Sequence, residues 1–138
     1  MPQYTSKTYD NATLLKAAGL VAASAAGSVI LDLGNGLMEG DLVIDVSALE
    51  VATGDEIYTI SLEGSNVAAM TSGSVELAKT TLGNNPAPAD ADTNVGRHVI
   101  PFRNELEGAN YRYVRLHTTV VGTIATGINY SAFIAKRN

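Results

Sequence analysis

The clearest pattern along the chain is an alternation of apolar and polar residues over residues 111–120. A β-strand places successive side chains on opposite faces of a sheet, so this pattern predicts a strand with one apolar and one polar face. The apolar side consists of Val114, Leu116, Thr118 and Val120, and the polar side consists of Tyr113, Arg115, His117 and Thr119. Because an isolated pair of strands is only marginally stable in water, the apolar face requires further strands and a second layer to cover it.

Shorter stretches rich in β-branched and aromatic residues predict at least five further strands, at residues 29–33, 41–49, 57–63, 97–102 and 128–135. Segments with the residues typical of turns separate them, at residues 34–36, 53–56, 104–110 and 122–127. Pro101 suits a strand at the edge of a sheet, because proline cannot donate a ladder hydrogen bond. Strands at intervals of roughly 10 residues with little helix predict an all-β fold, namely a two-sheet antiparallel β-sandwich.

Three stretches lack a decisive period. Residues 12–26 are rich in Ala and Leu, which favours a helix, but Gly19 and Ser24 interrupt the pattern, so a short helical turn and a strand both remain open. Residues 75–82 fit either a short helix or another strand. Residues 67–70 fit a short continuation of the strand at residues 57–63.

The chain divides into an extended N-terminal arm, residues 1–11, and a single sandwich domain, residues 12–138. The arm is polar but carries Tyr4 and Tyr9, so it is either a frayed terminus or a segment that packs on a neighbouring subunit. Residues 83–94 form a long loop with Pro86 and Pro88 and almost no apolar bulk. A loop of this length in a compact domain is usually functional or mobile.

Composition and charge narrow the classes of function. The chain has 138 residues and no Cys, which excludes disulfides and thiolate metal sites. A net charge of −5 and a pI of about 4.8 argue against a surface that neutralises phosphates, so no nucleic acid partner is expected. The N-terminus lacks the features of a signal peptide, and no stretch is suited to span a bilayer. The sequence therefore predicts a soluble protein that is made in a cytoplasm and has no membrane partner.

Residues that could perform catalysis are few. His98 shares a strand face with apolar neighbours, and His117 lies on the polar face beside Arg115. No Gly-x-Ser-x-Gly motif or Ser-His-Asp order is present, so we expect neither an enzyme nor a cofactor. Asp41 and Asp45 share a strand face about 13 Å apart, which is wider than the carboxylate pairs of glycosidases. They are expected to keep an exposed strand soluble.

A possible cation site is suggested by Asp90, Asp92 and Asn94, which match the first, third and fifth positions of a calcium-binding loop. Val95 and Pro101 stand where such a loop needs Gly and Glu. An EF-hand is therefore excluded, and only a weak cation site remains open. We expect that the chain holds no metal.

Four segments together resemble the jelly-roll cement (decoration) proteins of tailed bacteriophage capsids, most closely the type found in Bordetella phages. The segments are VILDLG at residues 29–34, GDEIYTISLEG at residues 54–64, RHVIPF at residues 97–102 and YRYVRL at residues 111–116. The resemblance extends from about residue 17 to the C-terminus. It implies a jelly-roll domain without catalysis or a cofactor, which binds the outside of an icosahedral shell as a dimer or trimer and bridges major capsid subunits.

The resemblance also implies the partners, which are the phage major capsid protein and further copies of this chain, and the location, which is the outer surface of the virion. The residues that we expect at the partner interface are Tyr4, Tyr9, Pro86, Pro88, Tyr113, Arg115 and His117. The alternative function is a carbohydrate- or receptor-binding β-sandwich of a phage particle. The absence of Trp counts against this alternative, because exposed aromatic rings stack on sugars.

Overall fold

The computed structural model describes residues 13–83 and 95–136, and this part of the chain forms strands, turns and loops without an α-helix. The longer strands are β1 (Leu14–Val21), β4 (Glu39–Leu49), β5 (Ile57–Ser65), β6 (Val75–Gly83), β7 (Gly96–Arg103), β10 (Tyr113–Val121) and β11 (Ile128–Lys136). The short strands are β2 (Ala25–Ala26), β3 (Leu31–Asp32), β8 (Glu105–Leu106) and β9 (Ala109–Asn110). The predicted all-β fold is confirmed.

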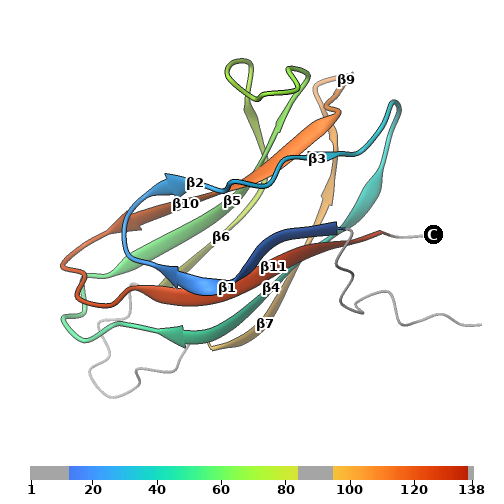
Figure 1. Ribbon diagram of the computed structural model, residues 1–138. Helices are drawn as coiled ribbons and strands as arrows, with labels where there is room; N and C mark the ends of the chain where they lie inside the picture. The colour runs from blue at the N-terminus through green and yellow to red at the C-terminus, as the bar shows by residue number, and fades with distance from the viewer. Residues whose placement is uncertain (1–12, 84–94, 137–138) are drawn as a thin grey trace, which may run out of the picture.

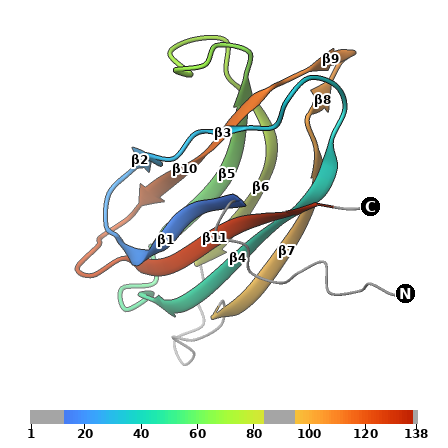
Figure 2. The same cartoon turned by 45° about the vertical axis from the view of Figure 1, so that its right-hand side comes forward.

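Two main antiparallel sheets pack face to face, and β8 and β9 pair separately as a short two-stranded sheet (Figures 1 and 2). Sheet A has the order β1-β11-β4-β7, and sheet B has the order β2-β10-β5-β6, with β3 also paired to β10. With β2 and β3 counted as one interrupted strand, the sheets join strands 1-8-3-6 and 2-7-4-5 of eight. This is the order of a jelly roll, in which the chain passes repeatedly between the two sheets.

The inner faces of the sheets form one hydrophobic core. On sheet B, Leu62 of β5 and Leu116 of β10 lie directly opposite each other and are buried. On sheet A, Ile44 of β4 and Ala132 of β11 form the equivalent buried pair. The alternation predicted for residues 111–120 is thus the alternation of β10, whose residues Val114, Leu116 and Thr118 are buried. Each fully buried aliphatic side chain of this size contributes about 1.5–3 kcal/mol through the hydrophobic effect.

The outer face of sheet A carries a second, smaller apolar cluster. Val43, Phe133 and Ala135 are buried there, and Leu14 of β1 packs against them. The guanidinium of Arg97 lies 5.6 Å from the centre of the Phe133 ring, an arrangement that attracts a cation to the ring face. Val43 departs from the apolar–polar alternation of its strand because sheet A is buried on both sides at this point.

Two of the three stretches that the sequence left undecided contain strands. Residues 14–21 form β1, which pairs with β11 even though its Ala and Leu content favours a helix, because the pairing covers one side of β11. The pairing is irregular: β1 advances three residues from Lys16 to Gly19 while β11 advances two from Ala132 to Tyr130. Such a β-bulge explains why the apolar residues of this segment follow no simple period. Residues 75–83 form β6, which pairs with β5.

Two further boundaries differ from those predicted. Residues 67–70 do not continue β5, because they form a turn closed by a hydrogen bond of 2.8 Å from the Met70 amide to the Val67 carbonyl. The strand expected at residues 29–33 is reduced to the two residues of β3. Pro101 lies in β7 at the edge of sheet A, as the sequence indicated.

The expectation that Asp41 and Asp45 keep an exposed strand soluble is wrong for Asp41. Its side chain is on the outer face of sheet A, but only 3% of the residue is exposed. Asp45 accepts hydrogen bonds of 2.7 and 3.0 Å from Nε and Nη2 of Arg97, so it forms an ion pair across to β7. Strand β4 lies in the middle of sheet A, between β11 and β7. These neighbouring strands explain both the burial of Asp41 and the ion pair of Asp45.

Two glycines allow a matched test of the close approach between the end of β1 and the turn before β11. Gly127 and Gly34 both have positive φ angles, of 101° and 82°. A Cβ atom on Gly127 would clash with the carbonyl oxygen of Val21, whereas nothing lies within 4 Å of a Cβ on Gly34. Both alanine variants therefore carry the cost of a left-handed backbone, about 1–2 kcal/mol, but Gly127→Ala must also displace β1.

We expect Gly127→Ala to lower the free energy of unfolding clearly more than Gly34→Ala does. Urea-induced unfolding followed by circular dichroism measures both variants against the parent protein. Equal losses for the two variants would contradict the close approach of the backbones at this turn.

Candidate functional site

Three of the seven residues predicted at a partner interface lie on the outer face of sheet B. Tyr113, Arg115 and His117 alternate along β10 with the buried residues of the core and point away from it. Strand β10 is central in sheet B, with β5 on one side and β2 and β3 on the other. The three side chains therefore lie in the middle of the outer face of sheet B, flanked by polar residues such as Ser61 and Glu63.

Ion pairs tie this face together. Arg115 Nε lies 3.2 Å from Glu63 Oε1 across the β10–β5 ladder, and the two side chains are only 23% and 24% exposed. Arg112 makes a bidentate pair with Asp32, with distances of 2.7 and 2.8 Å, and its guanidinium lies 5.3 Å from the centre of the Tyr113 ring. The hydrogen bonds from Arg112 and from the Gly34 amide lower the pKa of Asp32 to about 2.

His117 is held by hydroxyl groups and not by a carboxylate. Its Nδ1 lies 3.3 Å from Thr119 Oγ1, and its carbonyl accepts a hydrogen bond of 3.4 Å from Ser61. A histidine acts as a general base when it is close to a nucleophile and is oriented by a third group. The hydrogen bonds and ion pairs found in residues 13–83 and 95–136 do not assemble such a triad around His117.

The remaining predicted interface residues, Tyr4, Tyr9, Pro86 and Pro88, lie outside the described residues. The arm at residues 1–11 falls there too, as do Asp90, Asp92 and Asn94 of the possible cation site. In the part of the chain that the structure describes, no group of three or more His, Asp or Glu side chains is arranged to hold a metal ion.

At one end of the sandwich, acidic residues organise the loops in a way that the sequence did not suggest. The carboxylate of Glu50, which follows β4, accepts hydrogen bonds from the successive amides of Ala125, Thr126 and Gly127. These bonds, chiefly those from Thr126 and Gly127, lower the pKa of Glu50. The carboxylate thus fixes the loop between β10 and β11 to the end of β4.

In the turn between β4 and β5, carboxylates likewise accept hydrogen bonds from loop residues. Asp55 accepts hydrogen bonds from the amide and hydroxyl of Thr123, and the buried Glu56 accepts from the amide and hydroxyl of Thr53. Burial raises the pKa of Glu56, but hydrogen bonds from Thr53 and from the amides of Glu56 and Gly54 together outweigh burial and leave this pKa below its usual value. The pKa of Asp55 is lowered by the hydrogen bonds from Thr53 and Thr123. The arrangement connects the β4–β5 turn to the β10–β11 turn.

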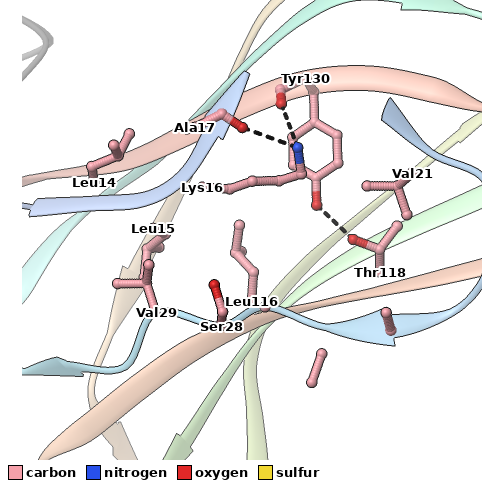
Figure 3. Close-up of a pocket in the computed structure, with 13 residues that line it drawn as sticks. Leu14, Leu15, Lys16, Ala17, Val21, Ser28, Val29, Leu116, Thr118 and Tyr130 are labelled. Atoms are coloured by element: carbon pink, nitrogen blue, oxygen red, sulfur yellow. Dashed lines mark hydrogen bonds between the residues drawn. The ribbon is translucent and has the colours of Figure 1, made fainter. Parts of the chain in front are cut away.

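A second feature missing from the sequence prediction is a cavity between the edge strands β1 and β2 (Figure 3). Apolar side chains from both sheets line it, and the Lys16 ammonium lies 4.6 Å from the centre of the Tyr130 ring. The hydroxyls of Tyr130 and Thr118 are 2.5 Å apart and form a hydrogen bond. One signal was visible in the sequence: Lys16 is the only charged residue between Asp10 and Asp32.

The depressed carboxylate pKa values predict a loss of stability in acid. A carboxylate whose folded-state pKa is low stabilises the fold above its ordinary pKa, and this contribution disappears as the pH falls towards the folded-state value. For Asp32 the window runs from its ordinary pKa of 3.8 down to about 2. Below neutral pH the free energy of unfolding should therefore decrease through this window.

The variants Asp32→Asn and Arg112→Gln each remove one partner of the Asp32–Arg112 ion pair. They therefore isolate the contribution of this ion pair to the pH dependence of stability. Both should show a shallower pH dependence of the urea unfolding free energy than the parent protein. A dependence as steep as that of the parent would mean that Asp32 does not take up its proton in this window.

Among the described residues there is no helix of the length and apolarity needed to cross a membrane. Comparison of the chain with models of known protein families and with curated protein sequences gave no match. What the protein does therefore has to be inferred from its fold and its surfaces.

Proposed function

We propose that this protein is a capsid cement protein of a tailed bacteriophage. It binds the outer surface of the capsid and holds neighbouring major capsid subunits together against the internal pressure of the packed genome. The observation that carries the proposal is the jelly-roll strand order, which is the fold implied by the resemblance of four sequence segments to such proteins. One fold can host many functions, so the proposal needs the sequence segments as well as the fold.

The physical demands of this role suit the chain. A cement protein adds interface that must break before capsomers can separate, and interfaces of standard size bury about 1,600 Å². Many copies on one shell, each a symmetric dimer or trimer, make the total stabilisation large through multivalency. The net charge of −5 favours solubility of the free protein and disfavours contact with nucleic acid before assembly.

The outer face of sheet B is the proposed contact surface. Arginine and tyrosine are enriched in protein interfaces, and Arg115 and Tyr113 stand on a rigid central strand. The ion pair with Glu63 already restricts the Arg115 side chain in the free protein. Binding then costs less conformational entropy than the ordering of a mobile arginine would.

A direct test uses empty shells assembled from the phage major capsid protein that is the proposed partner. The double variant Arg115→Gln and His117→Gln should reduce co-sedimentation with these shells, because it removes the charge and the ring at the centre of the face. The control is Arg103→Gln, which breaks an ion pair with Glu39 on the other sheet. Equal binding of the double variant and the control would refute the assignment of this face, and no co-sedimentation of the parent protein would refute the function.

Deletion of residues 1–11 tests the second proposed contact region. The truncated protein should bind the same shells more weakly, because Tyr4 and Tyr9 are lost. Its thermal unfolding should stay close to that of the full chain if the arm contributes to binding and not to folding. Decoration as tight as that of the full chain would show that the arm makes no contact with the shell.

A further inference from the structure

The cavity between β1 and β2 has the size and lining of a small-molecule site. Its volume is about 380 Å³, within the range of roughly 300–1,000 Å³ found for ligand pockets. Its apolar wall includes Leu15 from sheet A, Leu116 from sheet B and Val29 from the segment that follows β2. Figure 3 shows Leu15 and Val29 close together, with Leu116 to one side of them. The cavity lies at the side of the sandwich where the two edge strands leave the core accessible.

A single ammonium group lies at this cavity. Lys16 Nζ donates hydrogen bonds to the carbonyls of Gly19 and Tyr130 at 2.9 Å and to that of Ala17 at 3.1 Å. The bulge in β1 brings these carbonyls together, because the ladder between β1 and β11 is interrupted there. The three bonds hold the ammonium in place but provide only partial negative charge.

Lys16 has no counter-ion in the described structure. The ion pairs within residues 13–83 and 95–136 belong to Lys79, Arg97, Arg103, Arg112 and Arg115. Burial lowers the pKa of Lys16, which is the expected result when an ammonium is taken out of water without a carboxylate beside it. An anion that entered the cavity would relieve this cost.

The surroundings favour such an anion. The chain as a whole carries a net charge of −5, but residues 17–31, which supply much of the cavity wall and rim, carry no charge. The hydroxyls of Tyr130 and Thr118 are already bonded to each other. Lys16 is therefore the group in the lining that is suited to attract a charged ligand.

We propose that this cavity binds a medium-chain fatty-acid-type anion, that is, an apolar chain with one terminal carboxylate. The chain lies between Leu15, Val29 and Leu116, and the carboxylate accepts a hydrogen bond from Lys16. The carboxylate takes the place of the Ala17 carbonyl as a hydrogen-bond acceptor for Lys16. The bond from Lys16 to Ala17 is the longest of the three and the most exposed. This site is separate from the face proposed to contact a capsid, so it does not depend on the proposed function.

The test compares three ligands of equal chain length: decanoate, decanol and decyltrimethylammonium, each below its micelle concentration. Two-dimensional NMR of the full chain follows the methyl signals of Leu15, Val29 and Leu116 and gives the affinities. Decanoate should bind about tenfold more tightly than decanol, because a charge-assisted hydrogen bond is added, and the cation should bind most weakly. Equal affinities of decanoate and decanol would overturn the role of Lys16, and absence of shifts at the cavity with all three ligands would overturn the site.

Two pairs of variants locate the effect. Lys16→Met should abolish the preference for decanoate over decanol while decanol still binds, and Lys16→Arg should retain the preference. Ala25→Phe should block all binding, because Ala25 lines the cavity and lies opposite the inward-facing Thr118. Its control is Ala23→Phe, an exposed alanine of the same segment outside the cavity.

Thermal unfolding checks that each variant is folded. If Lys16→Met does not fold, the comparison of ligands in the parent protein still decides the role of the charge. Decanoate binding that survives Ala25→Phe and is lost in Ala23→Phe would place the ligand elsewhere and overturn the proposal.

Discussion

The structure depends on burying the inner face of β10 between the two sheets. Val114, Leu116 and Thr118 are buried from this strand alone, and β10 pairs with β5 over its whole length. Because alternate residues of a strand face opposite ways, the same pairing fixes which residues face outward. A shift of one residue would expose the core side chains and bury Arg115 and His117. The position of the candidate interface is thus a consequence of core packing.

The two sheets differ in what their outer faces carry. Sheet B has a polar outer face on which charged side chains are paired, as Arg115 is with Glu63. Sheet A has an apolar cluster around Phe133 on its outer face, buried as completely as the core. Antiparallel sheets commonly pack one face on a core and expose the other, and sheet B follows this rule more closely than sheet A. The polar outer face of sheet B is the one that we propose contacts another protein.

Side-chain carboxylates and one ammonium replace the backbone hydrogen bonds that the loops and the bulge cannot form. Glu50 accepts hydrogen bonds from three successive amides in the β10–β11 loop. Lys16 donates hydrogen bonds to three carbonyls at the bulge between β1 and β11. Buried backbone groups need partners, so these side chains satisfy groups that a regular ladder would have satisfied. The difference lies in charge. Glu50 meets the partial positive charges of amides in a loop, while Lys16 lies beside an apolar cavity and has no counter-ion within residues 13–83 and 95–136.

The sequence by itself determined the fold class, the main strands and the division of β10 into a buried and a polar face. These features follow from local periodicity and turn residues, which act over a few positions. Only the tertiary structure decided that residues 14–21 and 75–83 are strands, that Asp41 is buried and that Lys16 borders a cavity. Each of these depends on a partner distant along the chain, as Lys16 depends on the Tyr130 carbonyl across the interrupted β1–β11 ladder. Such pairings leave no periodic signal, because tertiary contacts override intrinsic propensity where a strand completes a sheet.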